Sequence, residues 1–191
     1  MKKHLCIAFV ASLTLLQGCA GLFIAGAATT AGAANDRRSF ATQMSDQNLE
    51  LKASSMLSQD KALSDASRIS IIANNGNLLL VGQTPTAAYQ KRAEKLIADI
   101  PGVRRVMNEL RISAPIDLAQ QTTDSWITTN TKTLIIDNPD VYTLKLKVVT
   151  ENSEVFLIGM VTEVEADTAV EVVRHVKGVQ RVVKVFEYVA K

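Results

Sequence analysis

Apolar residues and glycines recur in the same order in two parts of this chain. Three pairs of segments match: 46–49 (DQNL) with 124–127 (DSWI), 78–82 (LLLVG) with 155–159 (VFLIG), and 101–106 (PGVRRV) with 177–182 (KGVQRV). A repeat of this length predicts that one small domain architecture is used twice. The fold must therefore be one that each repeat can build from its own helices and strands.

Each repeat begins with a helical pattern. Asp46 and Asp124 are expected to cap this first helix, because their carboxylates can accept hydrogen bonds from the amides of its first turn. The apolar positions behind them have the spacing of a half-buried helix. They are Leu49, Ala53, Met56 and Leu57 in the first repeat, and Ile127, Thr131, Leu134 and Ile135 in the second.

Two strands, a second helix and a last strand follow in each repeat, because alternating apolar residues give way to a helical stripe and then alternate again. The expected boundaries are polar turns at 74–77 and 151–154, strand ends at Gly82 and Gly159, helix ends at Gly102 and Gly178, and last strands over 103–112 and 179–188. The order αββαβ, twice, predicts an α+β fold. In each domain two helices would cover one face of a small mixed sheet.

These motifs carry a family resemblance. Leu-x-Gly after a strand, a helix of about twenty residues, and then Gly-Val-x-x-Val is a pattern that resembles the BON domain, and it occurs at 80–106 and at 157–182. Ser153 departs from the pattern, since glycine is common there. Two such domains behind a lipidation motif are similar to the dual-BON outer-membrane lipoproteins. The resemblance implies a lipoprotein that faces the periplasm, binds anionic phospholipid through its second domain and helps to keep the outer membrane intact.

The N-terminus has the features of an export signal. Lys2 and Lys3 precede an apolar stretch, 5–16, that is too short to span a bilayer. The sequence Leu16-Gln17-Gly18-Cys19 then reads as a lipobox, which predicts a signal peptide over 1–18 and diacylglycerol with an N-acyl chain on Cys19. An ordinary secretory signal is the alternative. The other cysteine, Cys6, leaves with the signal, so we expect no disulfide in the mature chain.

The segment 19–45 is rich in alanine, glycine and threonine and is expected to be a flexible tether, in which Arg37 and Arg38 are solvated or meet phosphate headgroups. The expected domains are 46–114 and 124–191, joined by a linker at 115–123. Because Ala20 rather than aspartate follows the cysteine, the resemblance implies a lipid anchor in the outer membrane.

Catalysis is not expected. His175 is the only histidine that the mature chain keeps, and its counterpart in the first repeat is Asp99, which indicates a solvated position. Neither a cluster with metal-ligand spacing nor a phosphate-binding glycine loop occurs, so we expect no metal and no cofactor besides the covalent lipid. Glu163, Glu165 and Asp167 favour the start of a helix over a catalytic carboxylate pair. The net charge of +2 gives no basis for nucleic-acid binding.

Trp126 is the best candidate for a binding residue. It lies one place before the expected core position Ile127, so its ring should be exposed, and indole favours the bilayer interface. The expected lipid-binding residues are Trp126, Ile127, Asn130, Lys132 and Thr133. Packing of Trp126 against the other repeat or against 115–121 is the alternative. Residues 124–191 hold 8 Lys and Arg against 10 Asp and Glu, a charge of −2, so a local patch must attract acidic lipid.

The leading hypothesis is a non-catalytic lipid-binding module that supports outer-membrane integrity, with phosphatidylglycerol or cardiolipin as the anionic partner. The alternative is an adaptor that docks envelope or division-site proteins. Apolar residues also fall on the second face of the middle strands: Leu79, Val81, Phe156 and Ile158. They favour packing of one repeat on the other, with a protein partner as the alternative.

Overall fold

The computed structural model describes residues 36–138, 141 and 146–190. The predicted signal peptide, Cys19 and most of the predicted tether lie outside these residues. From Asn35 to Lys191 the chain forms one compact unit. This unit contains both repeats.

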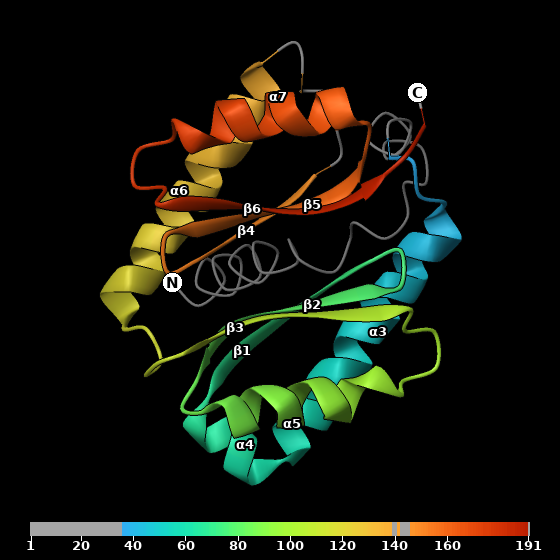
Figure 1. Cartoon of the computed structure of the whole chain (residues 1–191), viewed down its shortest axis with the longest axis vertical. Helices are drawn as coiled ribbons and strands as arrows, with labels where there is room; N and C mark the ends of the chain where they lie inside the picture. Colours follow the sequence, from blue (N-terminus) through green and yellow to red (C-terminus); the bar gives the residue numbers. More distant parts are fainter. Residues whose placement is uncertain (1–35, 139–140, 142–145, 191) are drawn as a thin grey trace, which may run out of the picture. The chain divides into compact units, whose positions relative to one another are not determined.

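The first repeat is a three-stranded sheet with helices on one face (Figure 1). Its elements are α3 (Phe40–Gln59), α4 (Lys61–Ala66), β1 (Arg68–Asn74), β2 (Asn77–Thr84), α5 (Ala87–Ala98) and β3 (Arg105–Ile112). The strand order is β1-β2-β3, in which β1 pairs antiparallel and β3 parallel with β2. The short helix α4 was not expected.

The second repeat has the same arrangement. Its elements are α6 (Leu118–Asp137), β4 (Lys147–Glu151), β5 (Glu154–Val161), α7 (Glu163–Arg174) and β6 (Arg181–Tyr188), with the order β4-β5-β6. Each repeat has its own core of apolar side chains from both long helices and the facing side of the sheet. The predicted α+β fold, with a small mixed sheet in each domain, is confirmed.

The predicted capping by Asp46 and Asp124 is wrong, because both helices begin earlier. Ser39 caps α3 by accepting a hydrogen bond from the amide of Thr42 at 3.1 Å, and Asp117 caps α6 by accepting one from the amide of Gln120 at 2.8 Å. The last residues of the predicted tether, 40–45, and most of the predicted linker, 118–123, are therefore helical. Since 118–137 contains neither glycine nor proline, nothing interrupts the longer helix.

Asp46 and Asp124 instead fasten each first helix to the β-hairpin. Asp46 is 1% exposed and accepts hydrogen bonds from the amides of Asn75 and Gly76 at 2.8 and 2.9 Å. Asp124 is 4% exposed and accepts them from Asn152 and Ser153 at 2.7 and 2.8 Å. These amides lie in tight turns, where positive φ angles point them inward together. Ser153, with φ 63°, adopts a conformation that glycine adopts in the first repeat.

The middle strands run two residues beyond Gly82 and Gly159, so these glycines do not end them as predicted. Gly82 has φ 126°, and a Cβ atom there would lie 2.0 Å from the carbonyl oxygen of Arg68. The close approach of β1 therefore requires glycine at this position, while pairing with β1 and β3 continues past it.

The two sheets pack on each other through the faces that point away from the helices. This confirms the prediction that the apolar residues on these faces pack one repeat against the other. The buried cluster between the sheets comprises Ile72, Leu79, Val81, Phe156, Ile158 and Val185. Ion pairs surround it: Arg68 with Glu151, Lys147 with Glu50 at 3.0 Å, and Arg111 with Glu154 at 2.8 Å. The alternative, a protein partner on this face, is therefore not needed to cover these side chains.

Arg37 and Arg38 are not the solvated linker residues that the sequence suggested. The side chain of Arg38 is 8% exposed and pairs with Asp46 at 2.8 Å. Arg37 forms two hydrogen bonds with the carboxylate of Glu165, at 2.8 and 2.9 Å, and donates to the carbonyl oxygen of Met160. The Arg37 guanidinium lowers the pKa of Glu165 to about 2. Neighbouring arginines in the chain thus contact both repeats.

Candidate functional site

Helix α6 positions most of the predicted binding residues. Its buried residues, Asp124, Ile127, Thr131 and Ile135, recur every three or four places and form one stripe that faces the second sheet. The opposite stripe therefore faces solvent over the whole helix. We call it the α6 outer face; its exposed residues are Leu118, Thr122, Trp126, Thr129, Thr133 and Ile136.

Trp126 is half exposed, at 50%, as its place beside the buried stripe predicts. The ring is therefore not enclosed by the other repeat or by the segment before α6. Ile127 is 0% exposed and belongs to the core of the second repeat, so its prediction as a lipid contact is wrong. A side chain that fills the core cannot also reach a membrane surface.

The remaining three predicted residues divide between two sides of the helix. Asn130 and Thr133 follow Trp126 at i+4 and i+7 and share its side, whereas Lys132 lies about 120° around the axis. Thr133 and Lys132 are exposed. Asn130 is partly buried, and its Nδ2 atom is buried with no hydrogen-bond partner among the described residues.

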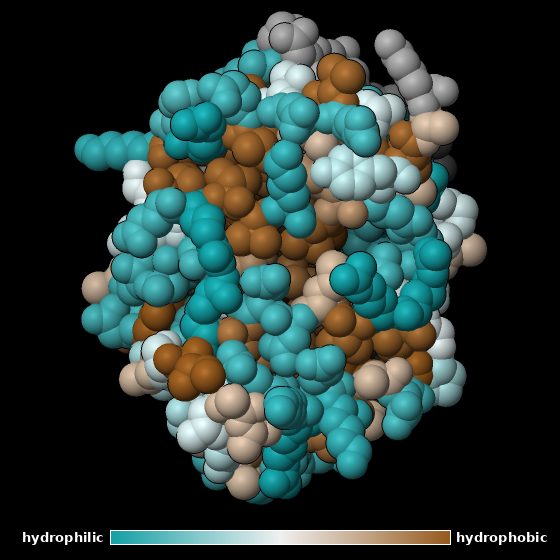
Figure 2. All heavy atoms as spheres, viewed as in Figure 1, coloured by the Kyte–Doolittle hydropathy of each residue, from teal (hydrophilic) through white to brown (hydrophobic). Residues whose placement is uncertain are grey.

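The α6 outer face is more apolar than the sequence reasoning recognised. Leu118 and Ile136 are 79% and 67% exposed, and at eighteen residues apart they lie on the same side of the helix, five turns from each other. The signal that could have found Leu118 is the unbroken helical segment back to Asp117, and Ile136 directly follows the expected core position Ile135. Most of the surface in the view of Figure 2 is hydrophilic, with apolar atoms reaching it mainly over the second sheet.

The threonine hydroxyl groups on the α6 outer face are satisfied within the helix. Thr122, Thr129 and Thr133 donate to the carbonyl oxygens of Leu118, Ser125 and Thr129, at 2.8, 3.0 and 3.1 Å. Such a hydroxyl presents its methyl group and a lone pair outward and keeps its hydrogen bond when water leaves. This lowers the cost of moving the α6 outer face out of water.

Charge is nearly absent from this helix. Between Leu118 and Ile136 the only acidic residue is Asp124, which is buried in its hairpin contacts, and the only basic residue is Lys132. The next residue, Asp137, is an exposed carboxylate at the C-terminal end of α6, on the side of Trp126 but eleven residues away from it. The part of the α6 outer face around Trp126 therefore has no exposed carboxylate to repel an anionic surface.

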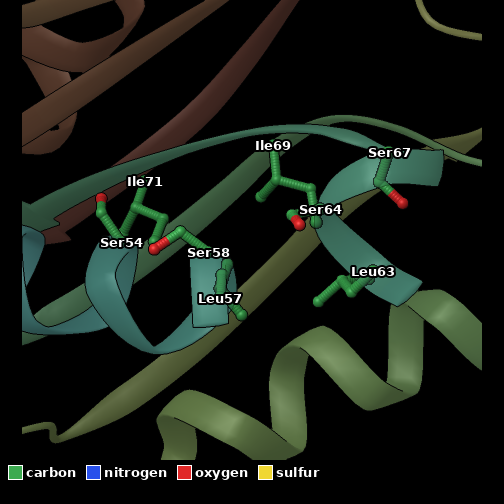
Figure 3. A pocket seen from close by; sticks show the side chains of 8 residues that line it. All are labelled: Ser54, Leu57, Ser58, Leu63, Ser64, Ser67, Ile69 and Ile71. Atoms are coloured by element: carbon green, nitrogen blue, oxygen red, sulfur yellow. The ribbon is translucent and has the colours of Figure 1, made fainter. Parts of the chain in front are cut away.

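A separate pocket of about 190 Å³ lies in the first repeat between α3, α4 and β1 (Figure 3). It is lined by Ser54, Leu57, Ser58, Leu63, Ser64, Ser67, Ile69 and Ile71. Ser58 and Ser64 donate to nearby backbone carbonyls, at 2.9 and 3.3 Å. None of the lining residues is a base that could activate a serine hydroxyl, so the pocket has no nucleophile–base pair.

Three of the four titratable groups singled out in the sequence contact oppositely charged or ionisable partners at the surface, and Glu163 lies in the first turn of α7. His175 is exposed and contacts Glu171 at 2.9 Å, Glu165 pairs with Arg37, and Asp167 pairs with Lys184 at 2.8 Å. In the part of the chain that the structure describes, no group of three or more His, Cys, Asp or Glu side chains is arranged to hold a metal ion. Within the same residues, no helix has the length and apolar character of a membrane span.

Comparison with known proteins identifies both repeats. The family model of the BON domain matches residues 45–114 and 123–190. The chain is 37% identical over 186 residues to "Outer membrane lipoprotein DolP" of Haemophilus influenzae, covering 97% of this chain and 96% of the relative. It is 44% identical over 154 residues to "21 kDa hemolysin" of Actinobacillus pleuropneumoniae, covering 81% and 79%.

Among solved structures, the C-terminal domain of CdsD, a structural protein of the type III secretion system of Chlamydia trachomatis, is similar with a TM-score of 0.31 and 12% identity, covering 73% of this chain and 96% of that one. A similarity of this size carries no argument here.

The similarity to an outer membrane lipoprotein over nearly the whole chain confirms the predicted localisation: the protein is lipid-anchored at the outer membrane and faces the periplasm. The matching family is one of non-catalytic domains, which supports the expectation that the chain is not an enzyme. With both repeats matched and a relative aligned over almost its full length, the chain belongs to the family of dual BON-domain lipoproteins.

Proposed function

We propose that this protein binds anionic phospholipid surfaces through its second BON domain and in this way supports the integrity of the outer membrane. The observation that carries the proposal is Trp126, a half-exposed indole on a helix face whose one exposed carboxylate, Asp137, lies eleven residues away at the end of the helix. Indole is favourable at the boundary between headgroups and acyl chains. The similarity to an outer membrane lipoprotein supports the setting, since a lipid-anchored chain keeps this face close to a membrane.

Leu118 and Ile136 also support binding of the α6 outer face to a lipid surface. They extend the apolar part of the α6 outer face across five helical turns, about 27 Å, so the helix can lie flat in the headgroup layer. Satisfied threonine hydroxyls between them reduce the loss of hydration on contact.

Tryptophan fluorescence provides the test, because Trp126 is the only tryptophan of the chain. The mature chain without acyl groups (residues 20–191) should shift its emission to the blue and cosediment with vesicles that contain phosphatidylglycerol or cardiolipin, and do neither with phosphatidylcholine. Trp126→Ala should cosediment at least tenfold less. Leu51→Ala is the matched control: it removes a 70% exposed apolar side chain from the corresponding helix of the first repeat and should bind as wild type does.

A protein-interaction adaptor is the second candidate function, and one feature favours it. Phe40, Met44 and Leu51 are 75%, 47% and 70% exposed and share one side of α3. Wild-type and Trp126→Ala chains that bind anionic vesicles equally weakly would refute the lipid proposal in favour of this adaptor.

A further inference from the structure

The turn that follows α7 lies against α6 (Figure 1), where Gly178 is close to Ile127, the residue next to Trp126 in the chain. It is a tight turn, with hydrogen bonds from the amides of Val176 and Val179 to the carbonyl oxygens of Val173 and Val176, at 3.0 and 3.1 Å. A Cβ atom on Gly178 would lie 3.1 Å from Cδ1 of Ile127, the residue next to Trp126 in α6. Backbone of the turn therefore rests directly on this part of the helix.

The same turn carries exposed bases. The side chains of Arg174 and His175 are 61% and 69% exposed, and Lys177, adjacent to Gly178, is exposed as well. The acidic residue that contacts them is Glu171, at 3.3 Å from Arg174 and 2.9 Å from His175. Lys177 has no hydrogen bond or ion pair among the described residues. Arg174 and Lys177 against Glu171 leave one positive charge.

The first repeat provides an internal comparison at the same place in the fold. Its corresponding turn also contacts the first helix, since a Cβ on Gly102 would lie 3.6 Å from Leu49. The counterparts of Trp126, Arg174, His175 and Lys177 there are Asn48, Ala98, Asp99 and Pro101. The first turn thus has the same geometry with neither an indole nor a base.

This comparison separates a binding role from a structural one. Bases near a helix C-terminus can stabilise the helix by interacting with its dipole. However, α5 ends at its turn without a base at either matching position, its one last-turn base being Lys95. The fold therefore does not need a base at the positions of Arg174 and Lys177. Helix stability does not explain why both bases occur in the same repeat as the exposed indole.

We infer that the turn over residues 174–177 is the part of the second domain that recognises the negative charge of lipid headgroups, while Trp126 enters the layer beside it. The inference rests on the proposed function and deepens it by assigning the selectivity for anionic lipid. It supplies the local positive patch that a domain with a net charge of −2 requires. The ligand chemistry is a phosphodiester with a net negative charge, presented at a membrane surface.

The test compares Arg174→Gln with Lys177→Gln, singly and together, in the mature chain without acyl groups. Each lost charge should weaken binding to phosphatidylglycerol vesicles about fivefold at low salt, and the double variant about 25-fold. The double variant should also lose most of the salt dependence of binding. Lys95→Gln is the matched control, because it removes a base from the last turn of the corresponding helix, and it should bind as wild type does.

The outcomes separate the two proposals. If wild type selects anionic vesicles and Trp126→Ala abolishes binding, but the double variant binds and responds to salt as wild type does, the inference about the turn is overturned and the lipid proposal stands. If wild type binds neither kind of vesicle, the lipid proposal fails first. Unchanged circular dichroism of the glutamine variants, expected because all sites are exposed, shows that the effects are not due to unfolding.

Discussion

Replacing Asp124 by alanine should strongly destabilise the second domain. The carboxylate accepts hydrogen bonds from the amides of Asn152 and Ser153 and from the side chain of Gln120, all between 2.7 and 2.8 Å, and it is 4% exposed. Alanine would leave both turn amides without a partner in a region that water scarcely reaches. It would also remove the only side chain of α6 that bonds to the turn backbone of the hairpin in the described residues.

The magnitude follows from the two amide bonds. A hydrogen bond to a charged acceptor contributes about 1.5–3 kcal/mol, so the loss of two predicts a decrease of about 3–6 kcal/mol in the free energy of unfolding. For a folded unit of this size, at about 3 °C per kcal/mol, that corresponds to a decrease in Tm of about 9–18 °C. Asp124→Asn keeps one acceptor oxygen but loses the charge, and should fall between wild type and Asp124→Ala.

The assay is thermal unfolding followed by circular dichroism, with amide hydrogen exchange at Asn152 and Ser153 as the local measure. Asp117→Ala is the matched control, because it removes a carboxylate that caps the same helix from an exposed position and should cost about 1 kcal/mol. If Asp124→Ala melts within about 3 °C of Asp117→Ala, or if both amides stay protected in it, the assigned role of Asp124 is refuted.

Two further predictions concern the backbone and pH. Gly82→Ala should abolish folding of the first domain, because its Cβ would clash with the carbonyl oxygen of Arg68 at 2.0 Å. Gly102→Ala meets only Leu49, at 3.6 Å, and should lose about 1–2 kcal/mol of stability because of its positive φ. Proteolysis and circular dichroism distinguish the two variants, and equal stability of both would contradict the steric argument. Arg37→Ala should raise the pKa of Glu165 from about 2 towards 4.5, as measured by NMR titration. Because that pKa is lower in the folded than in the unfolded state, the stabilisation by this ion pair is complete above about pH 4.5 and is lost as the pH falls towards 2, so wild type and variant should converge there.

The candidate site was predictable only in part. The position of Trp126 beside a buried stripe follows from helical periodicity, and so does its exposure. The same periodicity identified Ile127 as a core residue, which excludes it from a membrane contact. Leu118 was missed because the helix was expected to begin at Asp124, whereas Ile136 directly follows the expected core position Ile135 and was overlooked. The contact of the turn after α7 with α6, Gly178 against Ile127, joins residues 51 places apart in the chain.

The local sequence pattern alone determines the order of helices and strands in this protein and which faces of its sheets are buried. The repeated spacing of apolar residues specifies two αββαβ domains, and apolar residues on both sides of Leu78–Val81 and Val155–Ile158 specify sheets that are buried on two faces. These features depend on the period of a helix or strand, which a few consecutive residues define.

The tertiary structure decided which partners the polar groups take. Aspartate is a common helix-capping residue, yet the carboxylate of Asp124 accepts hydrogen bonds from backbone amides 28 and 29 residues away. The reason is that the hairpin turn leaves those amides without partners in a neighbouring strand. Arg37 likewise reaches Glu165, 128 residues further along the chain. A hydrogen bond or ion pair depends on which unsatisfied groups the packed elements bring within about 3 Å of each other, and that distance exists only in the assembled fold.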